Sequence, residues 1–181
     1  MRRIIFCLTV CLFSACAGSA PPRADNTGAL ATTNAPTNAS APAAGATPAQ
    51  MVRASAPPLT MRAGGAAEAE VRLQIADGYH VNANPASFPY LKATEVELVP
   101  AAGVTAGKPV YPPPVTRKFH FAPQPLAVYE GEATIRLPLK ARADAPKGAQ
   151  NLRARVHVQA CDEEKCFPPT TIETDIPVTI S

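Results

Sequence analysis

The chain has 181 residues, of which 46% are hydrophobic and 17% are charged, with 21 prolines and a formal net charge of +3. This small charge falls further once Arg2 and Arg3 leave with the leader described below, so the sequence gives no reason to expect nucleic acid as a partner. No segment reaches the roughly 20 consecutive apolar residues that a membrane-spanning helix needs.

Residues 1–15 have the pattern of a bacterial secretory leader, with a charged start followed by a short apolar run. The run ends in Phe13-Ser14-Ala15-Cys16, which resembles the lipobox of bacterial lipoproteins and predicts lipidation of Cys16. Ala17, rather than an aspartate, favours anchoring in the outer membrane. Cleavage after Ala17 by the ordinary signal peptidase is the alternative.

Residues 16–52 are predicted to be a lipid-anchored, disordered linker rich in alanine, proline and threonine. Such a composition buries too little apolar surface to fold. As a random coil, this segment would extend roughly 30 Å and let an anchored domain reach partners away from the membrane.

Residues 53–181 are predicted to form one all-β domain. Polar and apolar residues alternate at 70–75, 95–98 and 133–139, and turn signals separate these segments. Two further strands, at 152–159 and 172–180, are expected to pair as a hairpin. No segment shows helical periodicity. The pattern favours an immunoglobulin-like β-sandwich, with a closed barrel as the alternative.

Prolines add two expectations about this domain. Pro138 and Pro177 interrupt strand patterns and are expected at sheet edges or bulges, because proline cannot donate to a ladder. The segment 108–126 is proline-rich and carries two phenylalanines. A long loop of this kind suits a lid or a docking surface.

Cys7 and Cys11 are expected to be cleaved off with the leader, and Cys16 is expected to be lipidated. The cysteines that then remain are Cys161 and Cys166. An even pair in an exported protein is expected to form a disulfide. Closing so short a loop stabilises a fold by only about 2 kcal/mol. A domain of this size also folds without cross-links. Redox chemistry is therefore predicted, and a structural disulfide stays open.

Acidic residues surround the pair. Asp162, Glu163 and Glu164 oppose formation of a thiolate, and Lys165 offsets only part of their charge. Exchange is then expected to depend on a partner that supplies the attacking thiolate and docks specifically.

The run Gln159-Ala160-Cys161-Asp162-Glu163-Glu164-Lys165-Cys166-Phe167-Pro168-Pro169 resembles the family of N-terminal periplasmic domains of the thiol:disulfide interchange protein DsbD. The segments 77–82 and 128–132 also fit that family. The resemblance implies an immunoglobulin-like domain that relays electrons from a thioredoxin-like reductant to oxidised envelope proteins, without a cofactor. If active, it would be of the protein-disulfide reductase type. Because the chain ends at Ser181, a free-standing relay that depends on a separate reductant is expected.

The resemblance also implies residue roles. Cys166 would engage the partner, and Cys161 would resolve the mixed disulfide. Residues 117–125 would form a lid. The residues expected to line or shield the site are His80, Asn82, Phe119 and Phe121.

Two rival functions remain. A metal site is suggested by His80, His120 and His157 beside two cysteines. However, His157 would lie about 13 Å from Cys161 along one strand, so no metal site is predicted. The other rival is an envelope protein-binding module with a structural disulfide and no redox turnover, because sandwiches host many functions.

Overall fold

The computed structural model describes residues 48–181 and begins with a single helical turn, α1 (Pro48–Met51). The expected leader, the expected lipidation site Cys16 and residues 17–47 of the expected linker lie outside the described residues. The turn α1 was not predicted, because four residues are too few to show helical periodicity. In the described part of the chain, no helix has the length and hydrophobicity to span a membrane.

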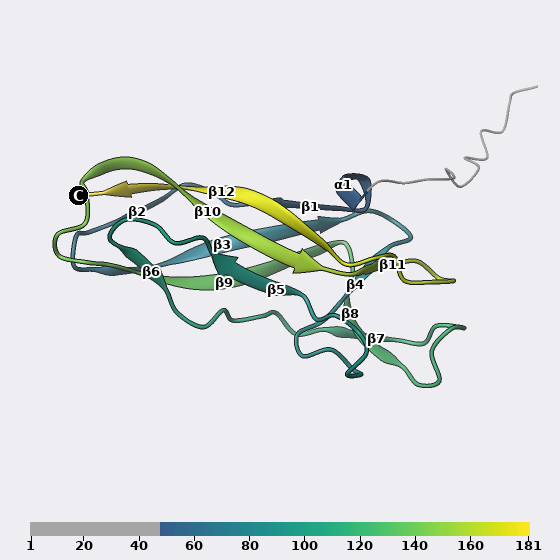
Figure 1. Ribbon diagram of the computed structural model, residues 1–181. Helices are drawn as coiled ribbons and strands as arrows, with labels where there is room; N and C mark the ends of the chain where they lie inside the picture. The colour runs from purple at the N-terminus through teal and green to yellow at the C-terminus, as the bar shows by residue number, and fades with distance from the viewer. Residues whose placement is uncertain (1–47) are drawn as a thin grey trace, which may run out of the picture. The chain divides into compact units, whose positions relative to one another are not determined.

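Two four-stranded sheets form the main body of the domain (Figure 1). The first has the strand order β1-β3-β9-β6, and the second has the order β2-β12-β10-β5. The strands of the first are β1 (Val52–Ser55), β3 (Ala66–Ile75), β9 (Glu132–Ala141) and β6 (Val104–Ala106). Those of the second are β2 (Leu59–Met61), β12 (Thr170–Ile180), β10 (Gly148–Val158) and β5 (Glu95–Leu98). The two sheets are hydrogen-bonded separately, which confirms an all-β, immunoglobulin-like fold and not a closed barrel.

Buried side chains on the inner faces of the two sheets pack against one another. Ile135 and Leu137 of β9 and Val156 and Ile176 of the second sheet have no exposed surface and belong to one hydrophobic core. Each such side chain stabilises the fold by about 1.5–3 kcal/mol relative to an exposed position. The strands predicted at 70–75, 95–98 and 133–139 are therefore confirmed as parts of β3, β5 and β9.

The longest ladder leads directly to the cysteine pair. Strands β10 and β12 pair in antiparallel fashion from Gly148 opposite Ile180 to Val158 opposite Thr170, as predicted for a hairpin. After Val158 the chain leaves this ladder. The short strand β11 (Ala160–Cys161) pairs instead with β4 (His80–Asn82).

Strands β11 and β4 belong to a third sheet, with the order β11-β4-β8-β7. Its remaining strands are β8 (Leu126–Tyr129) and β7 (Val115–Arg117). The four strands lie together at the end of the domain opposite the C-terminus (Figure 1). The site is therefore built where the main hairpin gives way to a separate small sheet.

Two proline positions differ from the expectation of edges or bulges. Pro138 and Pro177 lie in β9 and β12, which are interior strands. Each lies one residue outside the pairing with a short neighbouring strand, since β6 pairs from Leu139 and β2 pairs from Val178. A proline is tolerated in an interior strand where one neighbour is this short.

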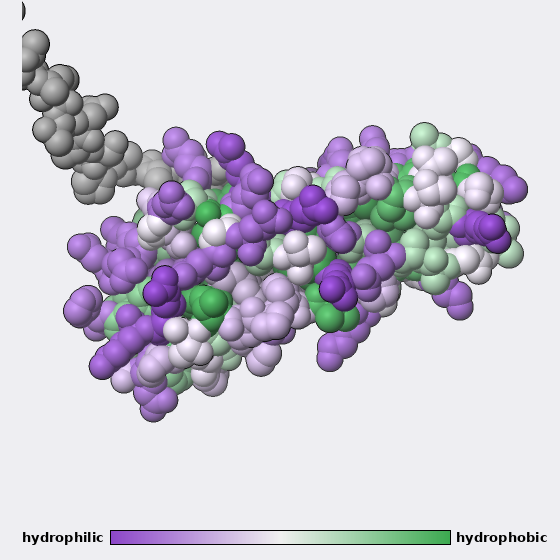
Figure 2. Space-filling model, turned by 180° about the vertical axis from the view of Figure 1, so that it is seen from behind, coloured by the Kyte–Doolittle hydropathy of each residue, from purple (hydrophilic) through white to green (hydrophobic). Residues whose placement is uncertain are grey.

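The core also extends toward the N-terminus. Met51 and Val52, which the sequence analysis assigned to the linker, are buried in it. On the face shown in Figure 2, hydrophobic residues form scattered patches between hydrophilic side chains. Scattered apolar residues of this kind are ordinary on a folded surface.

Candidate functional site

Cys161 and Cys166 form a disulfide, with an S–S distance of 2.01 Å and a Cα–Cα distance of 3.9 Å. Backbone bonds close the same loop independently of the sulfurs. The amide of Phe167 donates to the carbonyl oxygen of Ala160 at 2.8 Å, and the amide of Asp162 donates to that of Lys165 at 2.9 Å. The cysteine turn, defined as residues 161–166, is therefore held by the backbone as well as by the disulfide.

The carboxylate of Asp162 shapes this turn. Its Oδ1 accepts hydrogen bonds from the amides of Glu164, at 2.9 Å, and Lys165, at 2.8 Å. An aspartate that bonds the amides two and three residues later is a common turn-forming device. Asp162 thus has a structural role that the charge argument from sequence did not identify, whereas Glu163 and Glu164 are exposed.

The two sulfurs differ in exposure. Cys161 has 0% of its surface exposed, whereas Cys166 is partly exposed. An attacking thiolate has to approach its target sulfur in line with the bond that breaks. Of the two cysteines, only Cys166 has a surface that solvent reaches.

His80 lies directly opposite Cys161 in the β4–β11 ladder. Its side chain is buried, at 2% exposure, and its ring stacks on Phe119 with centroids 4.0 Å apart and an interplanar angle of 16°. Burial lowers the pKa of His80 below its usual 6.5, against the opposing charges of Glu130, Glu163 and Asp162. The imidazole is therefore mostly neutral near pH 7.

The segment between β7 and β8, residues 118–125, carries the two phenylalanines expected in a lid. Phe119 is 3% exposed, and its ring lies against that of His80. Phe121 is 36% exposed and stacks on Phe119, with ring centroids 5.4 Å apart. Phe119 packs with Leu126 and Val128 in a small separate core. We call residues 118–125 the lid loop.

An ion pair connects the base of the lid loop to the end of β8. Arg117 donates from Nε and Nη2 to the Glu130 carboxylate, with both closest distances at 2.9 Å. Such a two-point contact fixes the guanidinium in orientation as well as in position. A second contact also holds β8, since Oγ of Ser87 accepts a hydrogen bond from the amide of Ala127 at 2.7 Å.

Asn82 is 0% exposed and faces the junction between β10 and β11. Its Nδ2 donates to the carbonyl oxygen of Lys92 at 3.1 Å and to Oε1 of Gln159 at 3.3 Å. Within the described residues, its Oδ1 has no hydrogen-bond partner. Asn82 is therefore connected to the cysteine turn indirectly, by its hydrogen bond to Gln159.

Gln159 is a site residue that sequence reasoning missed. Its Oε1 also accepts the amide of Lys92 at 3.1 Å, and its Nε2 donates to the carbonyl oxygen of Phe167 at 3.2 Å. One amide group therefore joins the loop before β5, strand β4 and the segment after Cys166. The only signal in the sequence was its place two residues before Cys161.

The histidines do not converge on the cysteines. His120 is exposed in the lid loop, and His157 in β10 bonds Oγ1 of Thr171 at 2.8 Å. Among the described residues, no cluster of three or more histidine, cysteine or acidic side chains is arranged to hold a metal ion.

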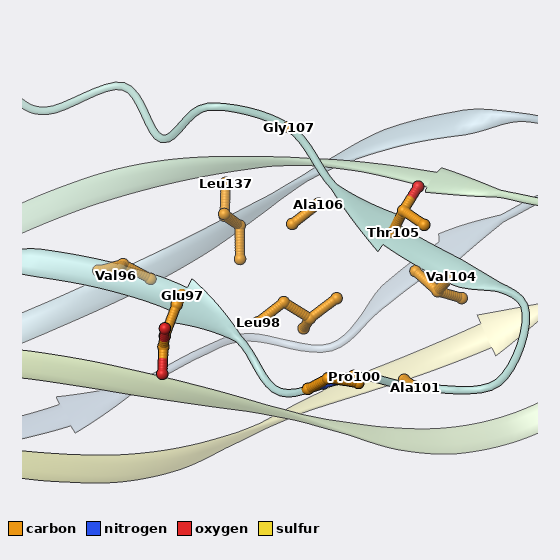
Figure 3. A pocket seen from close by; sticks show the side chains of 10 residues that line it. All are labelled: Val96, Glu97, Leu98, Pro100, Ala101, Val104, Thr105, Ala106, Gly107 and Leu137. Carbon is orange, nitrogen blue, oxygen red and sulfur yellow. The ribbon is translucent and has the colours of Figure 1, made fainter.

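A groove of about 480 Å³ lies away from these residues, between β5 and β6 (Figure 3). Leu98 and Leu137 project into it, and Glu97 is its charged lining residue. It contains no residue of the cysteine turn, the lid loop or β4.

Comparison with known proteins gives a family match over most of the chain. The family model described as thiol:disulfide interchange protein DsbD, N-terminal, matches residues 48–177. Comparison with curated proteins gives no match.

Among solved structures, the reduced N-terminal domain of DsbD from Neisseria meningitidis is 25% identical, covering 61% of this chain and 77% of that one, with a TM-score of 0.43. The N-terminal periplasmic domain of ScsB from Proteus mirabilis is 15% identical, covering 69% of this chain, with a TM-score of 0.43. This chain spans 44% of the length of the ScsB domain. A cohesin–dockerin complex from Clostridium thermocellum is 7% identical, covering 72% of this chain and 95% of that one, with a TM-score of 0.40.

Proposed function

Because this chain belongs to the family of DsbD N-terminal domains, and so is a thiol-disulfide interchange module, we propose that it relays electrons through Cys161 and Cys166. The donor is a thioredoxin-like reductant, and the acceptors are oxidised proteins of the cell envelope. The observation that carries this proposal is the unequal exposure of the two cysteine residues.

The unequal exposure of the two cysteines supports an order for the reaction. A thiolate of the reductant attacks Sγ of Cys166, the Cys161–Cys166 bond breaks, and Cys161 leaves as a thiolate with the electron pair. The second thiolate of the reductant then releases Cys166, so that this domain carries two thiols. In the onward reaction Cys166 attacks the acceptor disulfide, and Cys161 displaces the acceptor from the mixed disulfide.

The backbone of the cysteine turn supports redox turnover over a purely structural disulfide. The turn is held by the hydrogen bonds that the backbone amides of Asp162 and Phe167 donate, and by the two that the Asp162 carboxylate accepts. None of these hydrogen bonds requires the two sulfurs to be joined. The turn can therefore keep its shape in the dithiol state. A structural disulfide here would add little to a loop that is already closed.

The lid loop restricts access in this proposal. Phe119 covers His80, which lies opposite Cys161, and Phe121 lies over Phe119. A docking partner contacts and opens the lid loop, whereas a small thiol has to react at the partly exposed Cys166 with the lid loop in place. His80 and Phe119 line the site, Phe121 is its outer layer, and Asn82 supports it through Gln159.

The proposed location follows from the N-terminal sequence. Residues 1–15 act as the leader, Cys16 carries the lipid, and residues 16–52 tether the folded domain to the outer membrane, facing the periplasm. The main partners are thioredoxin-like proteins of the envelope. Nucleic acid is not among the proposed partners.

Trapping the mixed disulfide tests the relay. A Cys161→Ser variant keeps the reachable sulfur but cannot resolve, so it should accumulate a covalent complex with a thioredoxin-like envelope protein through Cys166. The matched Cys166→Ser variant should trap nothing. Recovery of no thioredoxin-like protein by Cys161→Ser, with both variants folded, would refute the relay and favour a binding module.

A further inference from the structure

His80 has a buried polar atom that the fold does not use. Within the described residues, Nε2 of His80 has no hydrogen-bond partner, although the residue is only 2% exposed. An unpaired buried polar group costs about 1–3 kcal/mol. Groups left in this state inside a fold often have a functional reason.

The ladder brings this imidazole next to the buried sulfur. His80 and Cys161 are direct partners in the antiparallel β4–β11 pair. Residues opposite each other in such a pair project from the same face, with Cβ atoms about 4.5–5.5 Å apart. The imidazole therefore lies within side-chain reach of Sγ of Cys161, on the side covered by Phe119.

We propose that His80 is the proton-transfer residue for Cys161 in the exchange reaction. This inference deepens the proposed function and rests on it. Cys161 needs such a group because it is fully buried, so water has no direct access to its sulfur while the lid loop is closed. Cys166, which is partly exposed, can exchange its proton with solvent.

The resolving step then balances as follows. The thiol proton of Cys161 passes to Nε2 of neutral His80, and Sγ of Cys161 attacks Sγ of Cys166. The Cys166–acceptor bond breaks, the Cys161–Cys166 bond forms, and the acceptor sulfur leaves as a thiolate with the electron pair. The imidazolium returns its proton to that thiolate or to solvent. When a reductant attacks Cys166, His80 takes up a proton from solvent and passes it to the departing Cys161 thiolate, which returns the imidazole to its neutral form.

Charged groups on three sides act on His80. Asp162 and Glu163 belong to the cysteine turn, Glu130 follows β8, and Arg117 ends β7. The three carboxylates favour the imidazolium, whereas Arg117 and burial disfavour it. Since Glu130 is paired with Arg117, their effects partly offset each other. Burial has the largest effect on the pKa of His80, so neutral His80 is available as a proton acceptor near pH 7.

The test is the lifetime of the mixed disulfide between Cys166 and glutathione. The reduced full chain is mixed with oxidised glutathione, quenched with acid and analysed by mass spectrometry at the peptide that contains Cys166. His80→Gln and His80→Phe should both prolong the mixed disulfide about 100-fold near pH 7, at the lower end of general acid–base effects. His157→Gln, on an exposed strand histidine, is the matched control.

The pH profile separates proton transfer from packing. In the wild type, the resolving rate should rise through the pKa of the imidazole, and both His80 variants should lose that inflection. His80→Phe keeps a ring that can stack on Phe119 but has no titratable nitrogen. If His80→Phe resolves as fast as the wild type with the same profile, His80 only packs and the inference is wrong.

A second measurement does not require a mixed disulfide. The fraction of Cys161 present as thiolate in the reduced chain, read from the NMR shift of its labelled Cβ atom, should fall at pH 7 in both variants, because they lack the imidazole that stabilises the thiolate. An unchanged thiolate fraction overturns the inference. Neither measurement uses a protein partner, so both can fail while the trapping of a thioredoxin-like protein succeeds, or the reverse.

Discussion

Phe119 of the lid loop and His80 of β4 stack face to face with ring centroids 4.0 Å apart, although the two residues are 39 positions apart in the chain. This contact joins the lid loop to the strand that faces Cys161. The position of the lid loop and the environment of the buried cysteine are therefore linked through a single pair of rings.

Phe119→Ala should make the disulfide less selective. Loss of an aromatic pair costs about 0.5–1.5 kcal/mol, so reduction by glutathione should speed up about threefold to tenfold. The measurement is the pseudo-first-order rate of disulfide reduction. Phe121→Ala, at the more exposed ring, is the control and should have a smaller effect. Equal rates in Phe119→Ala and the wild type would mean that the lid loop does not limit access.

The lowered pKa of His80 predicts a loss of stability in acid. Burial favours the neutral imidazole in the folded state, so the unfolded chain takes up more protons once the pH falls below about 6.5. The stabilisation from neutral His80 is complete above that pH and is lost as the pH falls toward the lowered folded value. Denaturant unfolding of the oxidised chain between pH 7.5 and 5 measures it. His80→Phe should flatten this dependence, whereas His157→Gln should leave it in place.

Gln159→Ala should loosen the junction between the main hairpin and the small sheet. The change removes the contacts to Lys92, Asn82 and Phe167, and those to Asn82 and Phe167 are partly buried. We expect a loss of about 1–3 kcal/mol in the free energy of unfolding, measured with urea. Gln74→Ala, on the exposed face of β3, should change stability by less than about 0.5 kcal/mol. Similar losses in both variants would contradict a special role for Gln159.

Asp162 allows charge and geometry to be separated. Asp162→Asn keeps an oxygen that accepts the amides of Glu164 and Lys165 but removes the negative charge. It should lower the thiol pKa of Cys166 and speed its alkylation in the reduced chain. Asp162→Ala removes the acceptor too and should cost about 1 kcal/mol in stability. If Asn and Ala variants behave alike in both assays, the turn contact is unimportant.

Sequence reasoning succeeded where strands alternate. The segment 95–98 is β5 as predicted, and the strands around the cysteines pair as the expected hairpin. Alternation reports burial of one face, so it identifies strands of a two-layer sandwich well. The disulfide between Cys161 and Cys166 was also expected from sequence, because the predicted leader and lipidation site account for the other three cysteines.

The small sheet was harder to predict for a physical reason. All three residues of β4 are buried, so His80, Val81 and Asn82 show no alternation. Nor does the sequence reveal that the chain changes ladders at Gln159, since that switch depends on contacts with Asn82 and Lys92. The choice between Phe119 and Phe121 likewise depended on how the lid loop folds back on β4.

The change of ladder at Gln159 separates two properties of the domain. The eleven residue pairs from Gly148 to Val158 belong to the main sandwich, whereas Cys161 belongs to the small sheet at its end. Substitutions in the cysteine turn or the lid loop therefore alter contacts outside the central core. Such an arrangement lets selection adjust partner choice and redox behaviour in one part of the domain without changing the residues that make it fold.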